Sequence, residues 1–146
     1  TPNLVKVLED PNIQVVGHFL RMDKKTLEYF LRPECKINNI FDTKIASRLT
    51  RKYSNEHGLT SLCQEFAGIR LDKKMASSDW AKDISEFSEK EKNYAAADVQ
   101  YLFLIKTKLE SMLKRENRYE IFLKCMAFLD TRIELDNLGF DKIFDH

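Results

Sequence analysis

Apolar residues along the chain follow two different spacings, and these predict a helix-rich chain with few strands. The stretch IQVVG at 13–17 is β-branched and apolar on both faces, which predicts a buried strand. The stretch NNIFDT at 38–43 predicts a second, shorter strand. Helical spacing of apolar residues predicts helices at 3–9, 24–31, 43–49, 59–69, 88 to about 115, and about 117–129. The predicted order is therefore α-β-α-β-α-α-α-α.

Local signals indicate where several of these helices begin and end. Asp10-Pro11 ends the first helix, because the residue before a proline disfavours helical geometry. Gly68 is expected to close the helix at 59–69. The sequence Ser88-x-x-Glu91 is a capping box, which predicts the start of the long helix, and residues 70–88 before it read as polar and irregular.

Two strands do not make a stable sheet, which bears on the fold class. A strand that is apolar on both faces is typical of the centre of a parallel α/β sheet. We therefore expect that the chain is a fragment or that another chain supplies strands. The length and the absence of an internal repeat predict a single partial domain over 1–146, with a core at about 1–115 and a C-terminal helix and tail at about 116–146.

Composition describes an ordinary globular chain and excludes several classes of protein. Apolar residues make up 43%, charged residues 32%, and the net charge is +1, so any attraction to nucleic acid must come from local patches. Cys35, Cys63 and Cys125 are far apart, which argues against a disulfide framework or a structural zinc site and for a reducing compartment. No apolar run is long enough to span a membrane and no signal peptide is visible, so a cytoplasmic protein is expected.

The segment NYAAADVQYLFLI at 93–105 places a carboxylate on an apolar stripe. In a helix, Asp98 shares a face with Tyr94, Tyr101, Leu102 and Ile105. A buried carboxylate is costly unless it is paired or bound to metal. Either Asp98 bonds a nearby backbone group or arginine while Tyr94 is a core residue, or the two side chains together hold a water molecule and a divalent cation.

Two further aspartates follow the predicted strands. In VVGHFLRMDKK at 15–25 the strand ends at Gly17 and a polar turn leads to Asp23. Ligands gather at the carboxyl ends of strands in open α/β sheets, which favours a binding role, but Asp23 is equally suited to cap a helix, with His18 a satisfied loop histidine. Asp42, after the second strand, is expected to cap the helix that follows.

Basic residues gather in two segments. Arg48, Arg51 and Lys52 lie at the end of the helix predicted at 43–49. The stretch LDKKMASSDW at 71–80 carries further lysines, hydroxyl groups and one tryptophan, which suit phosphate binding and base stacking. The alternatives are a solvated basic face and a connector whose tryptophan packs inward.

Taken together, these segments resemble the RNase D group of DEDD-type 3′–5′ exonucleases, over nearly the whole chain. Tyr94-Ala-Ala-Ala-Asp98 resembles the third exonuclease motif of the tyrosine subgroup, and GHFLRMD resembles the second motif, with Asp23 in the metal-binding position. The stretches FDTKIAS and GLTSLCQEFAGIRLDKKMASSDW look like the group's characteristic segments in the right order. The C-terminal FLDTRIELDNLGFDKIFDH looks like the end of the compact bacterial members of the group.

The resemblance implies a ribonuclease H-like fold and a two-metal mechanism with Mg²⁺ or Mn²⁺ that removes nucleotides from single-stranded RNA 3′ ends. It implies that Asp23 and Asp98 are metal ligands and that Tyr94 orients the attacking water. The expected nucleic-acid-binding residues are Arg48, Arg51, Lys52, Lys73, Lys74 and Trp80.

The chain departs from the family pattern at the first motif, Asp-x-Glu, for which nothing before Asp23 is a candidate. Glu9-Asp10 has the wrong spacing and lies at a helix end. We therefore expect this polypeptide alone to have little or no nuclease activity. Three explanations for the missing motif are open: the chain is part of a split or decayed gene, it is a shortened piece, or a separate N-terminal polypeptide completes the sheet in trans. An exposed strand edge also predicts self-association. The alternatives are an inactive remnant that binds nucleic acid or a partner, and a helical interaction domain with no affinity for metal or RNA.

Overall fold

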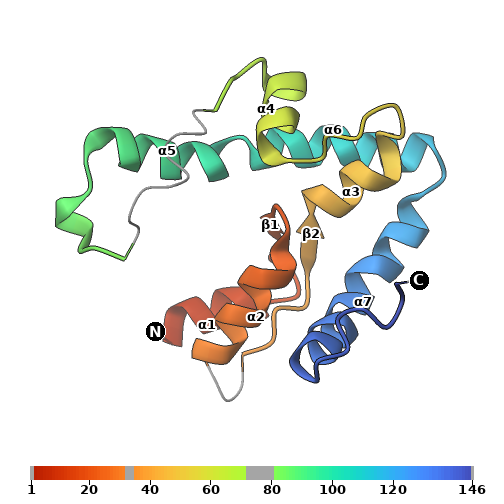
Figure 1. Cartoon of the computed structure of the whole chain (residues 1–146), viewed down its shortest axis with the longest axis horizontal. Helices are drawn as coiled ribbons and strands as arrows, with labels where there is room; N and C mark the ends of the chain where they lie inside the picture. The colour runs from red at the N-terminus through yellow and green to blue at the C-terminus, as the bar shows by residue number, and fades with distance from the viewer. Residues whose placement is uncertain (1, 32–34, 72–80, 146) are drawn as a thin grey trace.

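The computed structural model describes residues 2–31, 35–71 and 81–145, without the side chains of Ile84, Tyr94, Ala97 and Asp98. In these residues, short strands lie among many helices (Figure 1). The elements are α1 Pro2–Glu9, β1 Val15–Gly17, α2 Leu20–Phe30, β2 Ile40–Asp42, α3 Thr43–Thr50, α4 Leu59–Ala67, the 3₁₀ helix η2 Ile84–Glu86, α5 Glu89–Gln100, α6 Leu102–Arg115 and α7 Tyr119–Asn137.

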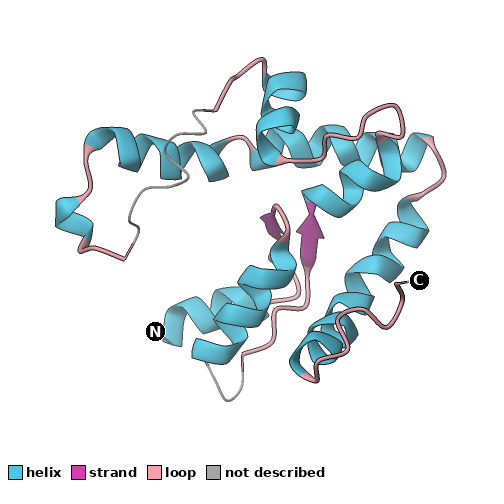
Figure 2. Cartoon of the chain, in the orientation of Figure 1, coloured by secondary structure: helices cyan, strands magenta, loops and turns pink. Residues whose placement is uncertain are grey.

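The two predicted strands are present and pair in parallel, at the centre of the molecule (Figure 2). The register places Val15 opposite Ile40 and Gly17 opposite Asp42, so both strands end at the same edge of the sheet. The helix α3 begins directly after β2. Groups that follow the two strands are thereby brought together, as the sequence predicted for the carboxyl ends of a parallel sheet.

Two helix boundaries correct the prediction. The single helix expected from 88 to about 115 is two helices, α5 and α6, separated at Tyr101. No glycine or proline marks this break, so the sequence carries no signal for it. The last helix continues to Asn137 rather than ending near 129, because its buried stripe continues from Leu129 to Ile133.

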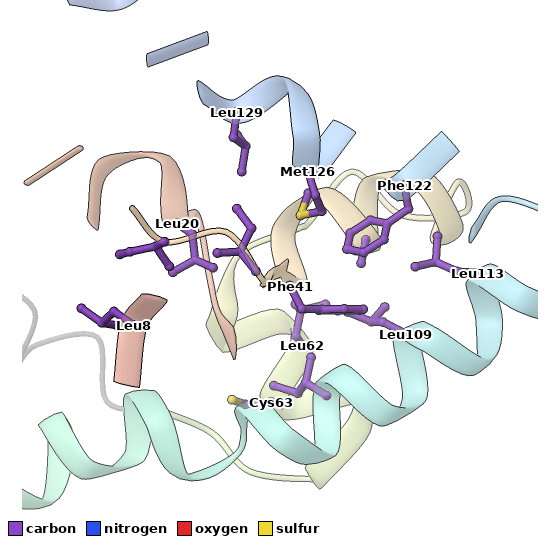
Figure 3. Close-up of a cluster of buried hydrophobic side chains, with 14 of the residues drawn as sticks. Leu8, Leu20, Phe41, Leu62, Cys63, Leu109, Leu113, Phe122, Met126 and Leu129 are labelled. Carbon is purple, nitrogen blue, oxygen red and sulfur yellow. The ribbon is translucent and has the colours of Figure 1, made fainter. Parts of the chain in front are cut away.

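The hydrophobic core forms where β2, α3, α4, α6 and α7 meet, and Leu8 of α1 and Leu20 of α2 extend it (Figure 3). Phe41 of β2 is fully buried and lies with its ring centroid 4.6 Å from that of Phe122. The buried stripe of α6 follows the helical spacing that the sequence predicts. Its members are Leu102, Ile105, Leu109 and Leu113. Among the described elements α6 packs most extensively against α3, and it also contacts β1 and α4.

Helix α5 differs from α6 in that the side chains described on it are mainly exposed. Val99 remains 59% exposed, and Ala95 and Ala96 are also on the surface. In Figure 1, α5 extends away from the core and leads into α6 beside β1. Of the stripe around Asp98, Leu102 and Ile105 are buried and Tyr101 is partly buried. In the described part of the chain no helix is both long and apolar enough to cross a bilayer.

Candidate active site

The edge at which both strands end is held by the buried side chain of Asp42. Its carboxylate accepts hydrogen bonds from the backbone N–H groups of Lys44 at 2.8 Å and Ile45 at 3.3 Å, which confirms the predicted cap of α3. It also accepts from the N–H groups of Phe19 at 3.2 Å and Leu20 at 2.8 Å, where α2 begins. One carboxylate therefore fixes the first turns of both helices relative to the sheet.

The turn between β1 and α2 is tight, and two residues adapt to it. An added Cβ at Gly17 would lie 2.3 Å from Cδ2 of Leu20, so a side chain at this position requires the Leu20 side chain to move. Phe19 has a φ of 64°, in the left-handed region that is unfavourable for a bulky residue. The hydrogen bond from its N–H to Asp42 helps to hold this conformation.

Asp23 lies in the first turn of α2 and is exposed. The expectation that it caps the helix is wrong, because α2 begins at Leu20 with Phe19 as the N-cap residue. Local burial and, to a smaller extent, the Asp42 carboxylate raise the pKa of Asp23, while a hydrogen bond from its own backbone N–H opposes this rise. A carboxylate whose charge is disfavoured in this way gains from a bound cation. The carboxylate oxygens of Asp23 and its exposed position fit the binding of a Mg²⁺ or Mn²⁺ ion.

His18 is held as a neutral ring by Thr43. The Thr43 hydroxyl donates to the carbonyl of Gly17 at 2.9 Å and lies 3.0 Å from Nδ1 of His18. The Thr43 hydroxyl donates its single proton to the Gly17 carbonyl, so it accepts a hydrogen bond from His18. Nδ1 of His18 therefore carries the ring proton. Burial lowers the pKa of His18 to about 4, against a smaller opposing effect of Asp42. The expectation of a satisfied loop histidine is thus confirmed at Nδ1.

This environment predicts a dependence of stability on pH. The pKa of His18 is about 4 in the folded chain and 6.5 in the unfolded chain, so the unfolded state binds the proton more tightly. Stability should therefore fall as the pH is lowered from 6.5 to 4, by about 1–3 kcal/mol from this residue. The measurement is urea unfolding at several pH values, with His18→Gln expected to flatten the dependence. An equally steep profile in that variant would contradict the assignment.

Both Tyr94 and Asp98 lie on α5, Tyr94 in the middle of the helix and Asp98 near its junction with α6. Their side chains lie outside the described part of the structure, so the convergence of Asp23, Tyr94 and Asp98 around a cation stays a prediction. Among the side chains that the structure describes, no three His, Cys, Asp or Glu residues form a metal-binding group.

The predicted nucleic-acid-binding residues separate into three groups. Arg51 is only 2% exposed, and its guanidinium bonds Glu65 and the carbonyl of Glu56, so it does not lie on the surface where it was expected. Arg48 and Lys52 are exposed. Lys73, Lys74 and Trp80 lie outside the described residues.

Comparison with known proteins decides the family. A family model described as 3′–5′ exonuclease matches residues 1–114. The chain belongs to the 3′–5′ exonuclease family. Ribonuclease D from Escherichia coli strain K12 is 33% identical over 107 residues, which cover 73% of this chain and 27% of that protein. This exonuclease chain therefore falls in the RNase D group and spans less than a third of the length of the curated relatives that it matches.

Solved structures support the fold. Brucella melitensis NrnC with bound Mg²⁺ is 40% identical, with a TM-score of 0.83, over 96% of this chain and 66% of that one. Brucella melitensis NrnC bound to pGG is 41% identical, with a TM-score of 0.83, over 95% of this chain and 65% of that one. The exonuclease chain has the ribonuclease H-like 3′–5′ exonuclease fold, rich in helices and with few strands, that the resemblance implied.

Proposed function

We propose that this chain is part of an exoribonuclease domain that removes nucleotides from the 3′ ends of single-stranded RNA. The observation that carries the proposal is the family match over residues 1–114, which includes the segments of both Asp23 and Asp98. The related NrnC structures contain Mg²⁺ in one case and pGG in another, which supports a divalent cation and a short nucleotide chain as ligands.

In this proposal each site residue has a separate task. Asp23 and Asp98 hold the divalent cations through carboxylate oxygens, and Mg²⁺ or Mn²⁺ serves equally in this role. When bound, the cations supply Lewis-acid stabilisation of the phosphodiester under attack. Tyr94 orients the attacking water through its hydroxyl group, since a phenol with an ordinary pKa near 10 is a weak base at neutral pH.

Basic side chains beside the site bind the RNA backbone. Arg48 and Lys52 are exposed and can contact phosphates, whereas Arg51 is buried and forms an ion pair with Glu65. The proposed surface also includes Lys73, Lys74 and Trp80 of the segment LDKKMASSDW. The tryptophan is suited to stack on a base.

We further propose that the 146-residue polypeptide by itself has little nuclease activity. Two aspartates supply too few anionic ligands to hold two divalent cations tightly. A polypeptide that contributes an Asp-x-Glu strand in trans would complete both the site and the sheet. The edges of the two-stranded sheet formed by β1 and β2 offer backbone groups for such pairing or for self-association.

The test is a nuclease assay with Mn²⁺ on a single-stranded RNA labelled at its 5′ end. We expect trace cleavage by the chain alone, equal to that of Asp98→Ala, and a gain of at least tenfold when a peptide carrying an Asp-x-Glu strand is added. Asp83→Ala, an exposed aspartate in the turn at Ser85, is the matched control. Robust cleavage by the chain alone that disappears in Asp98→Ala would contradict the proposed impairment.

The second candidate function is an inactive remnant of the domain that binds nucleic acid or a partner protein. Titration calorimetry with Mn²⁺ separates the two. Binding that is weakened at least tenfold by Asp23→Asn supports the metal site. RNA binding that is unaffected by Mn²⁺ and by Asp23→Asn favours the remnant.

A further inference from the structure

A groove between the start of α2, α3 and α7 has the size of a site for one small ligand. Its volume is about 620 Å³, within the roughly 300–1,000 Å³ of pockets that hold small molecules. Its floor is apolar and includes the side chains of Ile45, Ile121 and Leu129. Of the residues that line the groove, the nuclease proposal uses only Arg48. The remaining side chains therefore have no assigned task.

Five basic side chains line the groove and give it an excess of positive charge. They are Arg21, Lys44, Arg48, Lys124 and Arg132. Lys44, Arg48 and Lys124 form no ion pair with a carboxylate of the described residues. The Asp42 carboxylate at the groove already accepts from four backbone N–H groups. A ligand with more than one negative charge, such as a phosphate ester, is therefore favoured.

The two arginines at the groove are only partly neutralised by the protein. Arg21 and Arg132 share one carboxylate, that of Asp136, at 3.4 Å and 3.2 Å from their Nε atoms. Both Nε atoms are buried and have no hydrogen-bond partner among the residues that the structure describes. Buried polar groups are nearly always hydrogen-bonded, so this pair of guanidinium groups is short of acceptors. The acceptor atoms of a bound ligand can supply them.

Phe19 holds two of the cations in place beside the groove. Nζ of Lys44 lies 4.3 Å from the centroid of the Phe19 ring, and Cζ of Arg21 lies 5.4 Å from it. A cation at this distance is attracted by the face of the ring. The ring extends from a backbone with a φ of 64°, which is unfavourable for a bulky residue and is typical of binding and active sites. The charges are thus positioned before a ligand arrives.

Helix α7 places an aromatic ring between two cations. Lys124, Phe128 and Arg132 follow one another at four-residue spacing, so they lie on one face of the helix, one turn apart. All three line the groove, and Phe128 is 40% exposed. An exposed aromatic ring is suited to stack on a nucleobase of any kind, and a cation one turn away is suited to bind a phosphate. This arrangement matches the neighbouring base and phosphate of a nucleotide.

The groove is separate from the proposed metal site. Asp23 does not line it. Arg21, which does, is two residues from Asp23 on α2, so the two side chains point about 200° apart around the helix axis. A nucleotide in the groove therefore needs no divalent cation held by Asp23.

We propose that this groove is a second nucleotide-binding site, which takes one mononucleotide without a metal ion. The base packs on Phe128 and the apolar floor at Leu129. The 5′-phosphate binds Lys124 from α7 and Lys44 from α3. The guanidinium groups of Arg21 and Arg132 donate to acceptor atoms of the base or ribose. Binding of this nucleotide does not depend on whether the chain cleaves RNA.

The test is titration calorimetry with adenosine 5′-monophosphate in the presence of EDTA. We expect saturable binding to the wild-type chain and binding at least tenfold weaker for Lys124→Glu and for Phe128→Ala. Lys108→Glu and Phe103→Ala are the matched controls, because both positions are exposed on α6 outside the groove, and they should bind as the wild type does. All four positions are exposed, so thermal unfolding should show intact folding of each variant.

Further probes separate a nucleotide from other anions. Adenosine, which lacks the phosphate, and inorganic phosphate, which lacks the base, should each bind at least tenfold more weakly than the mononucleotide. Decanoate that binds more tightly, and more weakly in Phe128→Ala, would overturn the proposal in favour of an anionic amphiphile. A ten-nucleotide RNA that binds at least tenfold more tightly than the mononucleotide, and loses this affinity in Phe128→Ala, would overturn it in favour of an RNA strand.

Failure of the second site is distinguishable from failure of the proposed nuclease site. Mononucleotide binding that requires Mn²⁺, or that is lost in Asp23→Asn, would assign the nucleotide to the metal site and overturn the groove. No binding at millimolar concentration, or binding unchanged in Lys124→Glu and Phe128→Ala, would also overturn it. Binding that persists in Asp23→Asn supports the groove, whatever that variant does to the binding of Mn²⁺.

Discussion

Asp42→Ala is expected to destabilise the folded chain by about 3–5 kcal/mol, which corresponds to a loss of about 10 °C or more in Tm. The Asp42 side chain is 1% exposed and accepts from four backbone N–H groups, two at the start of each of α2 and α3. Alanine leaves these buried or partly buried donors without their acceptor and removes the side-chain acceptor from the first turns of two helices at once. Thermal and urea unfolding followed by circular dichroism measure the effect.

Asp42→Asn provides a graded comparison. Three of the four N–H groups bond Oδ1, and only that of Leu20 bonds Oδ2. An asparagine keeps Oδ1 and turns an amide donor toward Leu20, so a loss of about 1–3 kcal/mol is expected. Asp83→Ala removes an aspartate that bonds only its own exposed turn at Ser85, and its Tm should match that of the wild type. Equal Tm values for Asp42→Ala and Asp83→Ala would refute the double-capping role.

Arg51→Ala is expected to cost about 2–4 kcal/mol of stability, because it removes a buried guanidinium and the hydrogen bonds that this group donates to Glu65, Glu56 and Ser47. Two nitrogens of Arg51 donate to the same Glu65 oxygen, at 3.0 Å and 2.5 Å, and a third donates to the carbonyl of Glu56 at 2.6 Å and to the Ser47 hydroxyl at 3.0 Å. Burial alone would raise the pKa of Glu65, but hydrogen bonds from Arg51 and Tyr53 outweigh it and hold that pKa below its usual value. The Glu65 side chain is one-third exposed, which limits the cost of leaving it unpaired.

The control for Arg51 separates a structural role from RNA binding. Arg115→Ala removes an exposed arginine and should leave the Tm unchanged. Arg51→Lys keeps the charge but not the planar fork, so it should recover only part of the stability. Arg48→Ala and Lys52→Ala should weaken RNA binding without lowering the Tm, whereas Arg51→Ala should lower the Tm. A stable Arg51→Ala protein with a specific loss of RNA affinity would count against the buried role.

Much of the local structure could be predicted from the sequence because the relevant signals are local. Ser88 accepts from the N–H of Glu91, and the Glu91 carboxylate accepts from the N–H of Ser88, which is the predicted capping box. Gly68 ends α4 with a φ of 69°, as its place after the apolar stripe indicated. The buried spacing along α6 is likewise a property of neighbouring turns.

The helix boundaries that were predicted wrongly lie at positions that no local signal in the sequence marks. The start of α2 was predicted too late, because its cap is supplied by Asp42, more than twenty residues further along. The break at Tyr101 has no residue signal and coincides with the change from the exposed α5 to the buried α6. At the start of α2, a partner from another element determines the local geometry.

For the candidate site, the sequence by itself indicated the family, and it predicts Asp23 and Asp98 as metal ligands, since a motif is a pattern of neighbouring residues. Only the tertiary structure decided that Arg51 is buried and that Asp42 joins two helices to the sheet. The reason is that the type of a residue gives its charge and its hydrogen-bonding capacity. The partner that it bonds depends on which elements pack together. An arginine in a basic run is the same in sequence whether it contacts solvent, a phosphate or a buried glutamate.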